Sequence, residues 1–180
     1  MFISLSDTMW INFFLFFQVP PQIPPFSDLD SISRALTAKQ EGLNPYYDNP
    51  YNLKNNTYVY PSIWLHFFDL FNLNKKINFQ IFNFFLIYFY TFIYLKLASE
   101  INKYSFSIIL FIIFFSSASL LVIERLNIEI IIFIMMYFLA TSTSYKNQFM
   151  IYLIAVYGKL YPIFAVFIFV KNKKNLLLMI

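Results

Sequence analysis

The sequence predicts an all-α fold, a polytopic transmembrane helix bundle of about five to six spans with an external loop that contains a short amphipathic helix. Three observations lead to this prediction. Hydrophobic residues make up 59% of the 180 positions and charged residues only 12%, and the mean hydropathy is +0.61. Apolar runs of helix length recur, and lysines gather in short clusters at the ends of these runs. A soluble domain of this size would be hard to keep dissolved with such a composition.

Several apolar runs are long enough to cross a bilayer, for which a helix needs about 20 apolar residues with all backbone groups bonded internally. The predicted spans are residues 57–73, 77–97, 104–123, 128–143 and 149–170. Residues 1–19 are interpreted as a partial first span and 176–180 as the start of another, so both ends are expected to be cut. A secretory signal is the alternative at the start, but the first residues lack the basic region that it requires.

The lysine clusters predict an orientation, because Lys and Arg in short loops stay in the cytoplasm. Placing Lys75–Lys76 and Lys171–Lys174 inside is consistent with the number of spans between them. Residues 20–56 then form an extracytoplasmic loop, and Glu124–Arg125 lies near the inner face. The expected location is the bacterial inner membrane, in which the chain is multi-pass.

The external loop has a helix start of its own. The sequence predicts a helix over about residues 28–41, with Asp28 and Asp30 in its first turn, near the positive end of the helix dipole. Gly42 suits the left-handed residue that closes such a helix. The apolar face of this helix consists of Leu29, Ile32 and Leu36.

The composition excludes several kinds of chemistry. With no Cys and one His, the chain has no thiolate, iron–sulfur or histidine-cluster metal site, and no metal site is expected. His66 and Asp69, three residues apart, lack a third ligand. The lysines flank apolar runs, so no nucleic acid partner is expected. No cofactor is expected; a divalent cation is an alternative that nothing in the sequence indicates.

The acids that begin the external helix are the first candidate for chemistry. At a membrane surface, Asp28 or Asp30 is suited to accept a proton from an attacking hydroxyl or to hold a divalent cation. The alternative is that both acids only cap the helix.

Two further candidates lie within the apolar half of the chain. Glu124, Arg125 and Asn127 are wedged between apolar runs, where ionisable groups are costly; the alternative is an ordinary polar turn in which a glutamate neutralises Arg125. Lys159 falls near the middle of its predicted span, three residues before Pro162. There it is suited to line a cavity and bind an anionic lipid phosphate. A snorkelling lysine or a structural ion pair is the alternative there.

Five short motifs follow one another along the chain: Pro-Pro-Phe-Ser-Asp-Leu (24–29), Gly-Leu-Asn-Pro-Tyr (42–46), Tyr-Val-Tyr-Pro-Ser-Ile-Trp (58–64), Glu-Arg-Leu-Asn-Ile-Glu (124–129) and Lys-Leu-Tyr-Pro (159–162). In order and spacing the chain resembles polytopic bacterial glycosyltransferases of the GT-C type, in particular family-87 mannosyltransferase-like proteins and uncharacterised relatives. It departs from them at Ser62, where the usual pair has a second Pro, and at Leu126, where relatives often carry Gly. The first helix and the later half of a full-length enzyme are missing, so the resemblance implies a fragment.

The resemblance implies transfer of a sugar from a polyprenyl-phosphate donor to an acceptor hydroxyl at the outer face of the membrane. Membrane lipid and a lipid-linked sugar donor are the partners that it implies. By position, Asp28 matches the loop acid that acts as base in such enzymes, and Asp30 is its rival. The substrate-binding residues that the resemblance implies are Tyr60, Glu124, Arg125, Asn127 and Lys159.

Two other functions remain open from the sequence. One is a non-catalytic membrane protein that scaffolds or handles lipid-linked sugars. The other is a small transporter subunit in which the intramembrane charges line a path, although these charges are few and no half-repeat is visible.

Overall fold

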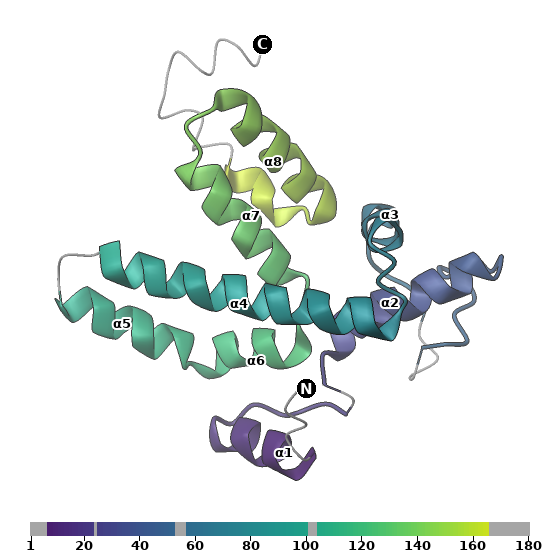
Figure 1. Ribbon diagram of the computed structural model, residues 1–180, viewed down its shortest axis with the longest axis horizontal. Coiled ribbons are helices and arrows are strands. Elements are labelled where there is room, and N and C mark those ends of the chain that lie inside the picture. Colours follow the sequence, from purple (N-terminus) through teal and green to yellow (C-terminus); the bar gives the residue numbers. More distant parts are fainter. Residues whose placement is uncertain (1–6, 24, 53–56, 101–103, 166–180) are drawn as a thin grey trace. The chain divides into compact units, whose positions relative to one another are not determined.

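The computed structural model describes residues 7–23, 25–52, 57–100 and 104–165. Within these ranges the chain is all-α, as predicted, with eight α-helices, one short 3₁₀ helix and no strand (Figure 1). In chain order the elements are α1 (Asp7–Phe16), α2 (Ser27–Gln40), α3 (Ser62–Leu70), α4 (Lys76–Glu100), α5 (Tyr104–Phe114), α6 (Ser117–Arg125), α7 (Glu129–Thr141), α8 (Tyr145–Gly158) and η1 (Tyr161–Ala165).

The chain divides into two compact units, each built from two separate segments. The first unit comprises residues 1–31 and 80–130, and the second comprises residues 32–79 and 131–180.

The first unit is built around a pair of antiparallel helical segments, α4 against α5 and α6 (Figure 1). The rings of Tyr90 and Tyr94 on α4 lie 6.1 and 5.2 Å, centroid to centroid, from the ring of Phe114 on α5. Tyr90 also hydrogen-bonds to Ser119 on α6. Because these contacts join the second half of α4 to the end of α5 and the start of α6, the chain folds back on itself here.

A bend of 46° separates α5 from α6, and serines satisfy the backbone groups that the bend releases. The hydroxyls of Ser116 and Ser119 each donate to the carbonyl of Ile113 at 2.7 Å. Ser116 also accepts from the backbone N–H of Ser119 and so caps α6. Apolar helices tolerate a break where side chains replace the lost backbone bonds in this way.

Helix α1 packs on α6 in the same unit. Phe14, Val19 and Leu120 form a small buried cluster, and partly buried residues close around it: Trp10, Phe17 and Ile123. The hydroxyl of Ser117 donates to the carbonyl of Phe17 at 2.7 Å. This packing holds the end of α1, and therefore the start of the following polar segment, against α6.

In the second unit α3 packs on α8 through a tryptophan that reaches a helix end. The indole Nε1 of Trp64 donates to the carbonyl of Gly158 at 3.0 Å, and Trp64 is 3% exposed. The last carbonyls of a helix have no partner inside the helix, so the indole caps the end of α8. A glycine is required at position 158, because a Cβ there would lie 2.6 Å from Cζ2 of Trp64.

Gly158→Ala is therefore expected to destabilise the protein by about 1–3 kcal/mol, the usual cost of forcing a methyl group into a packed core. Thermal unfolding of the purified protein in detergent would measure this loss. The matched test is Gly158→Ala combined with Trp64→Phe, which removes the ring atoms that the new Cβ meets. The two substitutions together should cost less than the sum of their separate costs, and strict additivity would contradict this account of the contact.

The described residues contain fewer helices of membrane-spanning length than the sequence predicts. Among the described residues one helix, α4, is long and apolar enough to cross a bilayer, and the bent pair α5–α6 is a second if it counts as one span. The other expected spans fall on shorter elements: α1 has ten residues, α3 nine, α7 thirteen and α8 fourteen. The prediction of five to six spans is therefore not confirmed. The expected segment at 176–180 lies outside the described residues.

The expectation of one helix over residues 149–170 is wrong within the described residues. Helix α8 ends at Gly158, and Lys159 is extended with φ −153° and ψ 141°. The chain then turns back as η1, where the carbonyl of Ile163 accepts from the Tyr152 hydroxyl at 3.2 Å. Pro162 has no N–H to continue the helix and disfavours helical geometry at the residue before it, so the helix stops short of the proline.

Candidate functional site

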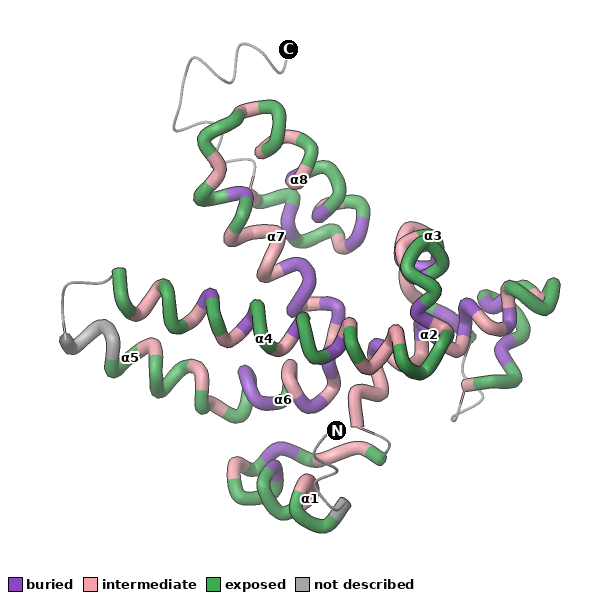
Figure 2. Tube along the Cα trace, in the orientation of Figure 1, coloured by how far each residue is buried: buried purple, intermediate pink, exposed green. Residues whose placement is uncertain are grey.

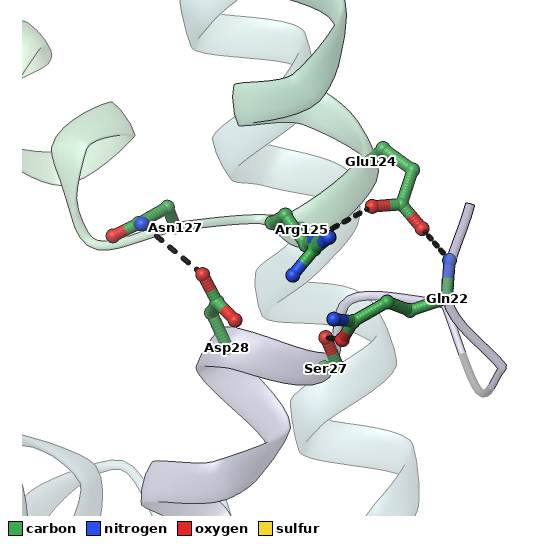
Figure 3. Close-up of polar contacts among 6 residues, drawn as sticks. All are labelled: Gln22, Ser27, Asp28, Glu124, Arg125 and Asn127. Carbon is green, nitrogen blue, oxygen red and sulfur yellow. Dashed lines mark hydrogen bonds and ion pairs between the residues drawn. The ribbon is translucent and has the colours of Figure 1, made fainter. Parts of the chain in front are cut away.

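The structure brings Asp28, in the first turn of α2, and the later polar motif together in the first unit. The side-chain Nδ2 of Asn127 donates to Oδ2 of Asp28 at 3.1 Å, across 99 residues of sequence (Figure 3). Oδ1 of Asn127 accepts from the backbone N–H of Glu129 at 3.4 Å, so the amide is engaged at both ends and its orientation is fixed. The contact with Asn127 therefore holds the Asp28 carboxylate in place.

A buried ion pair lies beside this contact. Glu124 is completely buried, and its Oε2 lies 2.9 Å from Nε of Arg125, whose side chain is 24% exposed. The other oxygen, Oε1, accepts from the backbone N–H of Gln22 at 2.5 Å. Oε1 of Glu124 thus hydrogen-bonds the proline-rich segment that leads to Asp28, whereas Oε2 makes an ion-pair contact with Arg125 and no hydrogen bond to a described residue (Figure 3).

Gln22 links the ion pair to the start of α2. Its side-chain amide hydrogen-bonds to the hydroxyl of Ser27. In the amide orientation that satisfies both of its polar atoms, Gln22 also accepts from the guanidinium of Arg125. Six residues therefore form one polar cluster, which we call the Asp28 site: Gln22, Ser27, Asp28, Glu124, Arg125 and Asn127.

Two bulky residues at this site have left-handed backbone conformations. Phe26 has φ 65° and Leu126 has φ 44°, values that side chains with a Cβ rarely adopt. Phe26 donates its N–H to the carbonyl of Glu124 at 3.0 Å, and Leu126 is the residue between Arg125 and Asn127. Each such residue costs on the order of 1–3 kcal/mol, and this kind of strain is concentrated at functional sites. It also explains why a glycine would suit position 126.

Helix geometry separates the two candidate acids. Asp28 and Asp30 are both half-buried in the first turn of α2. Residues two apart on an α-helix differ by about 200° around the axis, so they point in nearly opposite directions. Asn127 binds Asp28, and Asp28 is therefore the acid that belongs to the site.

The remaining predicted residues, Tyr60 and Lys159, lie in the second unit. There the hydroxyl of Tyr46 donates to the carbonyl of Tyr60 at 3.1 Å, and the N–H of Tyr58 donates to the carbonyl of Pro45 at 2.8 Å. Lys159 is half-buried directly after α8. The motifs at 42–46, 58–64 and 159–162 are thus neighbours, because Trp64 joins the second of them to the residue before the third.

The electrostatics of this tyrosine group follow from burial. Tyr58 is 4% exposed, and loss of solvation raises its pKa well above the ordinary value, with smaller contributions from Tyr46 and Tyr60. The hydroxyl stays protonated through the physiological range and donates to the carbonyl of Pro61 at 3.2 Å. Tyr58 is therefore a neutral hydrogen-bonding group and not a proton acceptor.

Sequence reasoning missed two members of the Asp28 site: Gln22, whose backbone N–H binds Glu124, and Ser27, which hydrogen-bonds to Gln22. The available signal was their place between a proline-rich entry and a helix start, where a backbone N–H and a side chain are both without helical partners. His66 and Asp69 are both exposed, and no group of three metal-ligating side chains occurs in the described part of the chain.

No family model, curated protein or solved structure matches this chain.

Proposed function

We propose that this chain is part of a GT-C-like membrane glycosyltransferase, which moves a sugar from a polyprenyl-phosphate donor to an acceptor hydroxyl. The observation that carries the proposal is the hydrogen bond between Asn127 and Asp28. It joins two motifs that the sequence resemblance names separately and that the predicted topology kept apart. Such convergence supports a shared site for the two motifs.

The chemistry of the proposed reaction suits the geometry of Asp28. The oxygen of the acceptor hydroxyl forms a bond to the anomeric carbon of the donor sugar, while the bond from that carbon to the phosphate oxygen breaks. The polyprenyl phosphate leaves with the electron pair, and the hydroxyl proton passes to the carboxylate of Asp28. Asn127 orients that carboxylate, and the Glu124–Arg125 pair fixes the loop that carries it. Tyr60 and Lys159 are proposed to bind substrate, with Lys159 at the donor phosphate.

The proposal includes insertion in the bacterial inner membrane as a multi-pass protein. Helix α4 has 25 residues and is about 37 Å long at 1.5 Å per residue, enough for the hydrocarbon layer. Many of its large apolar residues are exposed, and most of α4 is coloured exposed or intermediate in Figure 2, as expected for a helix in contact with lipid. The bent pair α5–α6 is the proposed return span, and the apolar helices α1, α7 and α8 are proposed to complete the bundle.

The proposed path of the chain differs from the topology that the lysines predicted. Helix α3, with nine residues, is about 13 Å long and too short to span. Residues 20–75 then stay on one side, and α4 with α5–α6 returns Asn127 to that side, where Asp28 lies. Lys75 and Lys76 fall on this side too. Lysines in short loops favour the cytoplasmic side, which opposes an extracytoplasmic location for Asp28. The sidedness of Asp28 is therefore the first part of the proposal to test by labelling.

The absence of native Cys makes the topology directly measurable. Single-cysteine variants Tyr47→Cys, Lys75→Cys and Ser99→Cys, all at exposed positions, would be treated in intact cells with a membrane-impermeant thiol reagent. The proposal expects labelling at positions 47 and 75 but not at 99. Labelling at 47 without labelling at 75 would restore α3 as a span, and labelling at 99 alone would place the site inside.

Transfer itself is tested with the purified chain in detergent, so that sidedness does not matter. Radiolabelled polyprenyl-phosphate sugars would be supplied with membrane acceptor extracts, and the sugar recovered in product would be counted. We expect transfer from at least one donor, and Asp48→Asn, an exposed acid in the same loop, should transfer normally. If no donor is used but the donor lipid still binds, a non-catalytic protein that handles lipid-linked sugars replaces the proposal.

A further inference from the structure

Asn83 is a buried polar residue on α4 that the Asp28 site does not yet include. Its side chain is 4% exposed, and its Oδ1 accepts no hydrogen bond from the residues that the structure describes. A buried acceptor without a donor is costly, and folded proteins contain few of them. Such an atom needs a donor that the described part of the chain does not provide.

The face on which Asn83 lies is the one that packs inside the first unit. The buried residues of α4 are Asn83, Leu86, Tyr90 and Ile93, with spacings of three, four and three. This spacing forms one stripe along a helix. Tyr90, on the same stripe, contacts Phe114 and Ser119, so Asn83 faces the α5–α6 side and not the lipid.

Helix register places Asn83 at the level of the site. Tyr90 and Ser119 are paired across the antiparallel helices. Seven residues back from Tyr90 is Asn83, and seven residues on from Ser119 is Leu126, each about 10.5 Å away along its helix at 1.5 Å per residue. Asn83 is therefore level with the strained residue that precedes Asn127, the ligand of Asp28.

Two other polar residues of the site already have partners. Asn127 uses its Oδ1 and its Nδ2 in hydrogen bonds, and Glu124 uses Oε1 in a hydrogen bond and Oε2 in an ion-pair contact. We propose that Asn83 is a further substrate-positioning residue of the Asp28 site, whose Oδ1 accepts a hydrogen bond from a hydroxyl group of the bound sugar. The inference rests on the proposed function, because that function supplies a polyhydroxylated ligand at this level of the fold.

The test separates stability from function. Asn83→Leu has a similar volume and no polar atoms, so removing the unpartnered acceptor should leave the ligand-free unfolding temperature unchanged or raise it by about 1–4 °C. The same variant should transfer sugar at least about ten-fold more slowly, because the hydroxyl then loses its partner. Asn83→Asp keeps an acceptor and should recover part of the rate. Thr91→Val, a polar-to-apolar change off the buried stripe, is the matched control and should alter neither quantity.

Two results would overturn the inference. A clear drop in the ligand-free unfolding temperature of Asn83→Leu would mean that the amide makes a structural hydrogen bond, and an unchanged transfer rate would mean that it touches no substrate. If the wild-type chain transfers nothing, the proposed function fails, and the inference is judged by binding. Added polyprenyl-phosphate sugar should then stabilise the wild type and Thr91→Val but not Asn83→Leu; equal stabilisation of all three, or of none, overturns the inference as well.

Discussion

If the proposed function holds, Asp28→Asn should reduce sugar transfer by about 10²–10⁴-fold while the protein still folds, because a positioned general base contributes this much to a rate. The substitution is nearly isosteric. The amide oxygen of the new Asn still accepts from Nδ2 of Asn127, so the local contact at 3.1 Å survives. What is lost is the ability to take the proton of the acceptor hydroxyl. Transfer rates at saturating donor, measured beside thermal unfolding, separate the two effects.

Asp30→Asn is the matched control for this prediction. It removes a carboxylate from the same first turn of α2, so the loss of helix-dipole stabilisation is the same, about 0.3–1 kcal/mol in each variant. Because Asp30 points away from Asn127, we expect its variant to keep a rate within a few-fold of the wild type. Equal losses of activity in the two variants would contradict the assignment of Asp28, and a larger loss in Asp30→Asn would reverse it.

Glu124→Ala should destabilise the protein by about 3 kcal/mol, the cost of removing one partner of a buried ion pair. Glu124 is completely buried and binds both Arg125 and the backbone N–H of Gln22. Its removal leaves the guanidinium without its counter-ion and the amide of Gln22 without an acceptor. The partial exposure of Arg125 keeps the estimate at the low end of the range for buried pairs. Chemical unfolding in mixed detergent micelles would measure this loss.

The chain offers a matched control for this prediction as well. Glu100 pairs with Lys96 at 3.8 Å on α4, but both side chains are about half-exposed. Glu100→Ala should cost no more than about 0.5 kcal/mol, as exposed pairs do. Adding Arg125→Leu to Glu124→Ala should recover part of the lost stability, because no unpaired buried charge then remains. A loss for Glu124→Ala as small as that for Glu100→Ala would show that the buried pair does not hold the site together.

Local features of the fold were predictable from sequence. The helix expected at residues 28–41 lies at Ser27–Gln40, and Gly42 has the left-handed conformation expected of a closing residue, with φ 85°. These features depend on acids, an apolar stripe and a glycine within a few residues of one another. The long apolar helix α4 was predictable for the same reason, because its apolar residues follow one another in the sequence and their number gives its length.

Features that depend on tertiary contacts were not predictable. The hydropathy of residues 149–170 predicts one helix. The hydrogen bond from Trp64 that caps α8 at Gly158 joins distant segments of the chain, and hydropathy carries no information about such a contact. The contact of Asn127 with Asp28 was missed because a topology built from lysine positions put the two residues on opposite sides of the membrane. Leu126 was known only as a departure from a family pattern; its left-handed backbone supplies the physical reason.

The most direct test of the account is whether residues 28 and 127 touch. The chain has no native Cys, so the double variant Asp28→Cys, Asn127→Cys carries only the two thiols of interest. A short thiol-to-thiol cross-linker would be applied to a form with a protease site between α4 and α5. The pair of Asp28→Cys with Ile108→Cys is the control, because exposed Ile108 lies on the same cleaved half as Asn127 but at the other end of α5 and α6, more than about 20 Å from Arg125 along these helices. We predict that the 28–127 pair keeps the cleaved halves joined and that the control does not; halves that separate in the 28–127 variant, although both thiols react with a monofunctional reagent, would contradict the existence of the Asp28 site.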